Sequence, residues 1–291
     1  MTSKATRHFG KVFDQVAADY DRHRPGYPDE LIDYACQIAG LGQGDNVLEL
    51  GCGSGQLTRS LVARGFRVTA LEPGKQLIAL AEKNVGRLGT VDFINAKFED
   101  AALQKRNYKA IFSASAFHWI DPDVSWQKTA ELLVSGGVLA LMQHFGLKEK
   151  RTSKDLDLQL AALKKIVPEV AAKWPHYYEL DEIIAGVKKR SQNISDVWSW
   201  LGDYDLSRKY VSRLFKDTQI AVVPNLIEQT ADELIALFST ISIYSTLSEQ
   251  QRSDLEHEYR EIYKRLGRPM RSSTVTILIT AGVQLSYEKI I

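Results

Sequence analysis

Three alternate glycines stand between a short apolar run and a helical pattern near residue 50. The run covers residues 47–50, the helical pattern starts at Gln56, and the glycines between them are Gly51, Gly53 and Gly55. Alternate glycines let the backbone turn sharply and approach a ligand at places where a Cβ atom would collide. The helix that follows offers free N–H groups to the same ligand. This order of strand, loop and helix predicts a ligand-binding loop, to which Cys52 contributes its backbone.

Two acidic residues flank the loop. Glu72 closes the second expected strand, where a carboxylate can accept hydrogen bonds from both ribose hydroxyls of a nucleoside cofactor. Glu49 precedes the first glycine, where it would repel the pyrophosphate of a dinucleotide but attract an ammonium group. The dinucleotide pattern also has a third glycine where this chain has Gln56. These residues favour S-adenosylmethionine, with its adenosine toward Glu72 and its amino-acid head toward the glycine loop.

From these residues the chain resembles the class I S-adenosylmethionine-dependent methyltransferases. The segments that carry the resemblance are 49–55 with 71–73, 96–100, 113–121, 133–141 and 20–28. The fourth-strand segment, 113–121, is similar to the small-molecule branch that includes the trans-aconitate methyltransferases, and segment 20–28 is similar to the part that folds over the cofactor there. The match covers residues 13–145 well and residues 216–291 loosely, and it does not specifically cover residues 150–215.

The resemblance implies a set of cofactor contacts. They are Tyr20, Arg24, Glu49, Gly51, Cys52, Gly53, Gly55, Glu72, Pro73, Gln76, Phe98, Glu99, Ser113 and Ala114. Lys97 stands where the family often carries an acid, so we expect the adenine amino group to be bound by backbone near Phe98 or by Glu99 instead. We expect no metal site, because Cys36 and Cys52 are too few for a structural metal cluster.

His118 is the first candidate for a catalytic side chain. It follows the fourth expected strand, where catalytic groups collect in open α/β sheets. Its ordinary pKa, about 6.5, suits a general base for a phenol, amine or carbon acceptor. A carboxylate acceptor would need no base at pH 7. The alternative is a histidine packed beside Trp119 with an architectural role, and Ser115 and His144 are weaker candidates.

The apolar pattern predicts an α/β fold with a doubly wound, mostly parallel seven-stranded sheet, Rossmann-like as in methyltransferases, and a helical cap inserted after the fifth strand. The expected strands cover residues 47–50, 67–71, 91–94, 109–114, 138–142, 220–223 and 274–280, with the sixth ended by Pro224. Helices are expected at 56–63, 76–84, 122–134, 231–245 and 248–266. We divide the chain into an N-terminal helical lid (1–45), the cofactor-binding core (46–147), a helical substrate cap (148–216) and helices and strands that complete the sheet (217–291).

Composition limits the partners. The 291 residues carry 37 Lys and Arg against 36 Asp and Glu, a formal net charge of +1, so no general field attracts nucleic acid or an anionic membrane. No apolar run is long enough to cross a bilayer, and the polar start lacks a secretory signal, so we expect a cytoplasmic protein. The expected partner is a small-molecule methyl acceptor whose identity the sequence leaves open, as it does the oligomeric state.

Two other functions stay open. A nicotinamide-dependent oxidoreductase would share the sheet, the glycine turn and the ribose-binding acid, although Glu49 and Gln56 count against it. A non-catalytic protein that binds S-adenosylmethionine is the second, because methyl transfer requires no diagnostic catalytic residue. The aromatic residues between 150 and 215 either line an apolar acceptor pocket or form the core of the helical cap.

Overall fold

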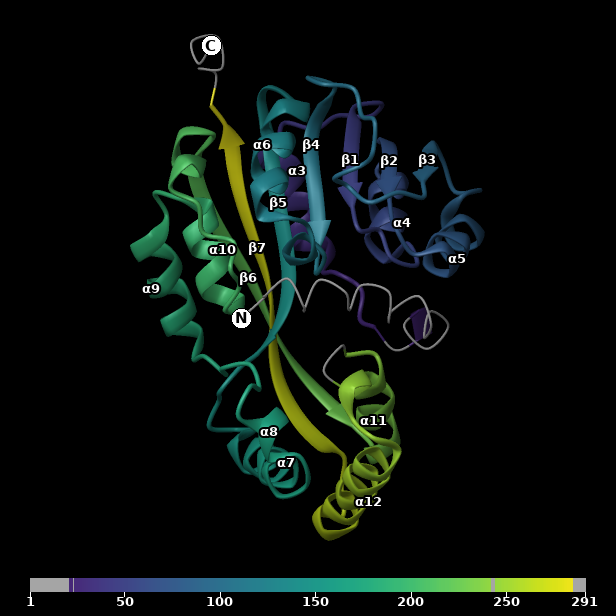
Figure 1. The fold of residues 1–291 in the computed structure, drawn as a ribbon, viewed down its shortest axis with the longest axis vertical. Coiled ribbons are helices and arrows are strands. Elements are labelled where there is room, and N and C mark those ends of the chain that lie inside the picture. Colours follow the sequence, from purple (N-terminus) through teal and green to yellow (C-terminus); the bar gives the residue numbers. More distant parts are fainter. Residues whose placement is uncertain (1–20, 23, 242–243, 285–291) are drawn as a thin grey trace.

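The computed structural model describes residues 21–22, 24–241 and 244–284, which contain a seven-stranded sheet in the order β3-β2-β1-β4-β5-β7-β6 (Figure 1). The strands are β1 (Asn46–Leu50), β2 (Arg67–Leu71), β3 (Val91–Ile94), β4 (Tyr108–Ala114), β5 (Leu133–Gly146), β6 (Phe215–Gln229) and β7 (Met270–Val283). Strands β1 to β5 are parallel, whereas β7 runs antiparallel to both β5 and β6. The predicted fold class is confirmed.

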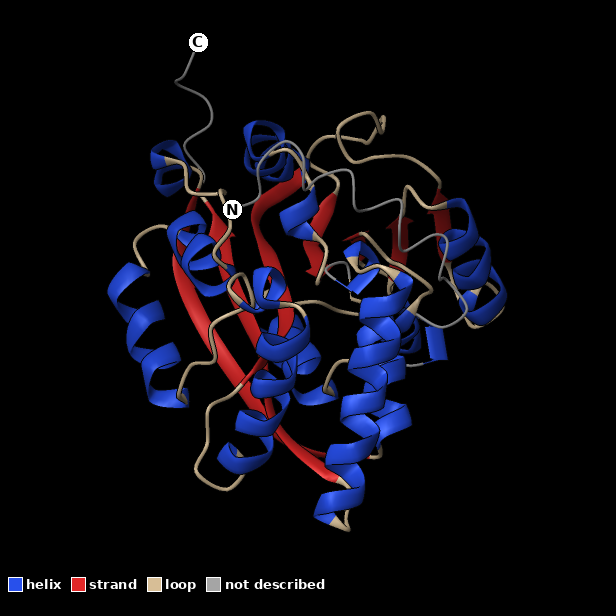
Figure 2. Ribbon diagram, turned by 60° about the horizontal axis from the view of Figure 1, so that its bottom comes forward, coloured by secondary structure: helices blue, strands red, loops and turns tan. Residues whose placement is uncertain are grey.

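Helices cover both faces of this sheet (Figure 2). They are α3 (Asp29–Ile38), α4 (Gln56–Ala63), α5 (Lys75–Val85), α6 (Pro122–Leu132), α7 (Ser153–Ile166), α8 (Pro168–Ala171), α9 (Leu180–Arg190), α10 (Ile194–Gly202), α11 (Ala231–Ser239) and α12 (Glu249–Leu266). One face packs against α3, α4 and α5, and the other against α6, α9 and α10. A central strand such as β1 is therefore buried on both sides, which explains its nearly continuous apolar sequence.

Strands β5, β6 and β7 are much longer than the apolar patterns predict. Strand β6 does not end at Pro224 but continues past it, with Pro224 paired to Val275 of β7. The prediction failed because β6 is the outermost strand of the sheet, and an edge strand tolerates a residue that cannot donate on its open side. The helix expected at 231–245 also ends earlier, at Ser239, and a short 3₁₀ turn follows at Tyr244–Thr246.

The long strands carry a second lobe. Helices α7, α8, α11 and α12 pack around the far parts of β6 and β7 and form a separate apolar cluster (Figure 1). Asp155 of α7 is buried and accepts hydrogen bonds from both terminal nitrogens of Arg268 and from the Arg271 backbone, which fixes α7 to the start of β7. Residues 148–216 thus contribute α7 and α8 to this second lobe, and α9 and α10 to the face of the sheet.

The arrow of β4 points toward the second lobe in Figure 1, so the carboxyl ends of the parallel strands face it. Ligands of open α/β sheets bind at these ends. Within the described residues, no helix combines the length and the apolar character that crossing a bilayer requires.

Candidate cofactor and acceptor site

The glycine loop leaves β1 and enters α4 with three residues in left-handed backbone conformations. The φ angles are 71° at Gly51, 57° at Gly53 and 96° at Gly55, a region that other residues rarely adopt. A Cβ atom on Gly51 would lie 2.3 Å from the Ala116 Cβ, and one on Gly55 would lie 2.7 Å from the Val85 Cγ2. The first and third glycines are thus required by close packing as well as by the turn.

Glu72 follows β2 and is tied to the glycine loop. Its carboxylate accepts a hydrogen bond from the Gly53 N–H at 3.1 Å and another from the Gly74 N–H at 2.8 Å. An ionised carboxylate has two oxygens that together can accept about four hydrogen bonds, which suits a group that binds hydroxyls. Glu72 is 7% exposed, and its predicted contact with the ribose of a cofactor stays a prediction.

Glu49 belongs to β1, directly before the loop, and is 1% exposed. Thr58 of α4 donates its hydroxyl to the Glu49 carboxylate at 2.6 Å. Burial raises the pKa of Glu49 to about 7, with the hydrogen bond from Thr58 lowering it and the charge of Glu72 raising it. A cationic group near Glu49 would favour the ionised form.

Cys52 sits between these acids and is almost fully buried. Burial, together with the charges of Glu49 and Glu72, holds the pKa of its thiol well above the ordinary value. The thiol therefore stays protonated and is a poor nucleophile. This agrees with the expectation that only its backbone serves the loop.

The loop after β3 was expected to bind adenine. The Phe98 ring is 3% exposed and packs in the apolar cluster under α6, while its carbonyl accepts a hydrogen bond from Lys128 at 2.6 Å. Glu99 accepts a hydrogen bond from the Asp121 N–H at 2.9 Å. Both residues are thus already engaged within the protein, so their contacts to adenine stay a prediction. Pro73 and Gln76 are exposed at the start of α5.

At the end of β4, two hydroxyl residues link the strand to its surroundings. Ser113 is buried and donates its hydroxyl to the Leu50 carbonyl at 3.0 Å, which joins β4 to the end of β1. Ala114 ends the strand, and Ser115 follows with a φ of 55°. Tyr27 donates its hydroxyl to the Ser115 Oγ at 3.1 Å. The segment before α3 is thereby held against the exit of β4.

His118 lies beyond Ser115, and its ring stacks on Tyr204 with ring centroids 4.4 Å apart and planes 4° apart. The Tyr204 hydroxyl accepts a hydrogen bond from the Gln143 side-chain amide at 2.6 Å. Burial, together with the charge of Arg24, lowers the pKa of His118 to about 3. At pH 7 the imidazole is neutral and a weak base, unlike the group with an ordinary pKa expected from the sequence. Its role as a general base stays a prediction.

His144 forms a second histidine contact on the neighbouring strand. Its ring stacks on Tyr27 with centroids 4.8 Å apart, and its Nδ1 lies 2.9 Å from the Thr276 Oγ1. Burial and the charge of Arg24 lower the pKa of His144 to about 4. Arg24 itself donates to the Thr240 carbonyl of the second lobe at 2.8 Å. Two neutral imidazoles and one guanidinium thus surround this end of the site.

Sequence reasoning did not assign Gln143 or Thr276 to the site, and it included Tyr204 only among the aromatic residues between 150 and 215 that could line an acceptor pocket. The three residues come from β5, from the turn after α10 and from β7, so no local motif links them. Tyr20, expected to contact the cofactor, lies outside the described residues.

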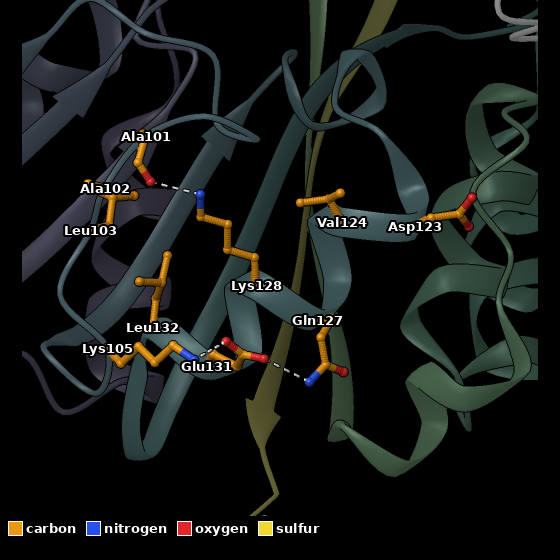
Figure 3. Close-up of a pocket in the computed structure, with 10 residues that line it drawn as sticks. All are labelled: Ala101, Ala102, Leu103, Lys105, Asp123, Val124, Gln127, Lys128, Glu131 and Leu132. Carbon is orange, nitrogen blue, oxygen red and sulfur yellow. Dashed lines mark hydrogen bonds and ion pairs between the residues drawn. The ribbon is translucent and has the colours of Figure 1, made fainter.

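A surface hollow lies beside α6 and is lined by a different set of residues (Figure 3). It is lined by Ala101, Ala102, Leu103, Lys105, Asp123, Val124, Gln127, Lys128, Glu131 and Leu132. No residue expected from the sequence to bind the cofactor lines it. Among the described residues no group of three or more His, Cys, Asp or Glu side chains is arranged to hold a metal ion.

Comparison with known proteins shows which sequences are similar to this chain. Residues 48–141 match the family model for a methyltransferase domain. An uncharacterized methyltransferase of Mycobacterium tuberculosis (strain ATCC 25618 / H37Rv) is 34% identical over 140 residues, which are 47% of this chain and 53% of that protein. Another from Geobacillus kaustophilus is 32% identical over 144 residues, 45% of this chain and 64% of that protein. The chain spans about half the length of the first of these relatives.

Two solved structures share the fold. A chain from Anaeromyxobacter dehalogenans, provisionally assigned as a type II methyltransferase, has a TM-score of 0.55 and 20% identity, covering 89% of this chain and 97% of that chain. An S-adenosylmethionine-dependent methyltransferase of Thiobacillus denitrificans, solved with S-adenosylhomocysteine, has a TM-score of 0.50 and 16% identity, covering 90% and 94%. At this identity the likeness concerns the fold. Residues 48–141 are thus similar to a methyltransferase domain, within a chain that has the fold of known methyltransferases.

Proposed function

We propose that this chain transfers a methyl group from S-adenosylmethionine to a small organic acceptor, in which a carboxylate, hydroxyl or carbon is methylated. The observation that carries the proposal is the pair of buried acids on either side of the glycine loop. Glu72 is bonded to the N–H groups of Gly53 and Gly74, and Glu49 to the Thr58 hydroxyl. Such a pair suits a ligand with hydroxyls at one end and a positive charge at the other.

The residues present fit this cofactor. Glu72 would hold the ribose, the glycine loop would pass close to the ligand, and Glu49 would attract the ammonium group of the amino-acid head. When bound, S-adenosylmethionine supplies a methyl group on a positively charged sulfur. Binding of the cationic head would draw the pKa of Glu49 below its present value of about 7 and so keep the carboxylate ionised.

The acceptor end lies where β4 and β5 leave the sheet. Positive charge from Arg24 acts on both His118 and His144, whose imidazoles are neutral at pH 7. This charge favours an anionic acceptor, and a carboxylate is the first candidate, as the resemblance to the trans-aconitate branch also suggests. A carboxylate requires no base, which agrees with the low pKa of His118. The chain's contribution is then to orient the two reactants and to keep water out, effects that together supply several kcal/mol.

The division into lid, core, cap and completing segment is part of this proposal. The described part of segment 1–45 contacts both the end of β4, through Tyr27, and the second lobe, through Arg24. A segment with these contacts suits closure over a bound cofactor.

Calorimetric titration with S-adenosylhomocysteine tests the cofactor site, and we expect a Kd in the micromolar range, about −8 kcal/mol. A turnover assay then follows S-adenosylhomocysteine release over a panel of small carboxylates, phenols and amines. Binding without turnover on any acceptor would favour the non-catalytic alternative. A thermal shift with NAD and none with S-adenosylhomocysteine would instead favour the oxidoreductase.

A further inference from the structure

The ammonium group of Lys128 on α6 donates hydrogen bonds to three backbone carbonyls of one loop. The Nζ donates to the carbonyl oxygens of Phe98 at 2.6 Å, Ala101 at 2.8 Å and Glu99 at 3.2 Å. The bond to Ala101 is drawn in Figure 3. An ammonium group has three donors, so these bonds use all of them. The same Nζ lies 5.0 Å from the centre of the Phe98 ring, within the range of a cation–π contact.

The loop whose carbonyls bind Lys128 also contacts Glu72, a residue of the candidate cofactor site. It follows β3 at the carboxyl edge of the sheet, and Asn95 donates its side-chain amide to the Glu72 carbonyl at 2.9 Å. Glu99 accepts from the Asp121 N–H, which stands at the start of α6. The loop is therefore held between Glu72 and α6, with Lys128 as its cationic centre.

Three converging carbonyl oxygens repel one another unless a cation or several donors stand between them. Lys128 supplies that cation and thereby selects this backbone conformation over others that a loop of this length can adopt. Because a trans peptide sets its N–H opposite its C=O, fixing the Phe98 carbonyl on Lys128 directs the Glu99 N–H away from it. A side chain on α6 thus determines the direction in which the Glu99 N–H points.

We propose that Lys128 is a positioning residue for the nucleoside end of the cofactor, acting by holding loop 96–101 in the shape that receives the adenine. The inference rests on the proposed function, since it concerns the same cofactor. It does not assign Lys128 a contact with the cofactor itself. It explains how an adenine loop can be ordered in a chain whose Lys97 replaces the acid that the family often carries there.

The test compares two ligands in three proteins. The ligands are S-adenosylhomocysteine and S-inosylhomocysteine, in which a carbonyl oxygen replaces the 6-amino group of the base. The proteins are the parent chain, Lys128→Met and the control Lys105→Met. Lys105 lines the same hollow and pairs with Glu131 at 2.8 Å, and its side chain is 73% exposed (Figure 3). Calorimetry gives both Kd values, and thermal melting gives the stability of each protein.

We expect Lys128→Met to weaken S-adenosylhomocysteine about tenfold or more and to bring the ratio of the two Kd values close to one. Lys105→Met should leave both Kd values within about twofold of the parent. A loss of thermal stability in Lys128→Met with an unchanged Kd ratio would overturn the inference and leave Lys128 a purely structural residue. If Lys128→Met does not fold, Lys128→Gln keeps two N–H donors without the charge, and an unchanged ratio there overturns the inference equally.

The two proposals fail in different ways. A parent protein that binds neither ligand contradicts the proposed function and removes the inference with it. A parent that binds S-adenosylhomocysteine, beside a Lys128 variant with the same Kd and the same ratio, contradicts the inference alone.

Discussion

The proposed cofactor end and the proposed acceptor end of the candidate site are built in opposite ways. At the cofactor end, Glu49, the glycine loop and Thr58 come from one continuous segment, and Glu72 from the next strand. At the acceptor end, Tyr27, His118, Gln143, Tyr204 and Thr276 come from five separate parts of the chain. The cofactor end is thus a local feature of the sequence, whereas the acceptor end exists only after the chain has folded.

The two ends also differ in charge. Two buried acids stand at the cofactor end, while the acceptor end combines Arg24 with two neutral histidines. Opposite potentials at the two ends would orient a cofactor whose positive centre lies between them and an acceptor that carries a negative charge. A substitution at one end should therefore change the binding of only one reactant, either the cofactor or the acceptor.

The largest effect is expected at Glu72. In Glu72→Ala the N–H groups of Gly53 and Gly74 lose their carboxylate partner, and the ribose loses its acceptor. Charge-assisted bonds of this kind are worth about 1.5–3 kcal/mol each, so S-adenosylhomocysteine should bind about 100-fold more weakly by calorimetry. Asp92→Ala on the neighbouring strand β3 removes an exposed acid and serves as the control. Equal losses in both variants would count against a ribose site at Glu72.

Gly51→Ala should disturb the cofactor end through packing. Its φ of 71° disfavours alanine, and the added Cβ meets the Ala116 Cβ at 2.3 Å. Gly136→Ala has nearly the same φ, 73°, but no atom lies within 4 Å of the new Cβ. We expect the first variant to lower the free energy of unfolding by about 1–3 kcal/mol more than the second. Equal losses in urea titrations would show that the close approach to Ala116 is unimportant.

The pH dependence of cofactor binding should come from Glu49. Its pKa of about 7 means that the carboxylate is increasingly protonated below pH 7 and ionised above it. A ligand with an ammonium head needs the ionised form, so its affinity should rise by up to about tenfold per pH unit on approaching pH 7 from below, then level off. Calorimetry with S-adenosylhomocysteine between pH 5.5 and 8 measures this slope. In Glu49→Gln the slope should disappear, and a slope that persists there would assign it to another group.

The smallest effect is expected at Tyr204. Tyr204→Phe keeps the ring stacked on His118 but removes the hydroxyl bonded to Gln143. One hydrogen bond is worth about 1 kcal/mol, so kcat/KM for an acceptor found in the turnover screen should fall about fivefold. The Kd for S-adenosylhomocysteine should stay unchanged. Tyr210→Phe, whose hydroxyl bonds the Pro122 carbonyl at 3.4 Å, is the control, and an equal fall there would mean that Tyr204 has no special role.

The contrast between the ends explains what the sequence could predict. The glycine loop, Glu49, Glu72 and the parallel strands are signalled by neighbouring residues, so the sequence predicts them together with the fold. The stack of Tyr204 on His118 depends on how α10 packs on the sheet, which no local pattern encodes. The low pKa of His118 likewise results from burial under elements far away in the sequence.

The aromatic residues between 150 and 215 lie in different surroundings. Trp198 is fully buried in the cluster over the sheet and belongs to the core, as one of the two interpretations held. Tyr204, a few residues later, reaches the end of β4. Composition predicted an aromatic cap but could not assign these roles, because the direction of each side chain depends on tertiary packing.

Strands β6 and β7 run without interruption from the sheet into the second lobe. Two lobes joined by a flexible hinge can move apart. Two lobes that share a pair of strands can separate only if the strands bend or if the hydrogen bonds between them break. The shared strands therefore keep the second lobe at a nearly constant distance from the ends of the parallel strands. Under the proposed function, acceptor selection by size should accordingly depend on the side chains near the strand ends, and enlarging one of them should exclude bulky acceptors while small ones continue to fit.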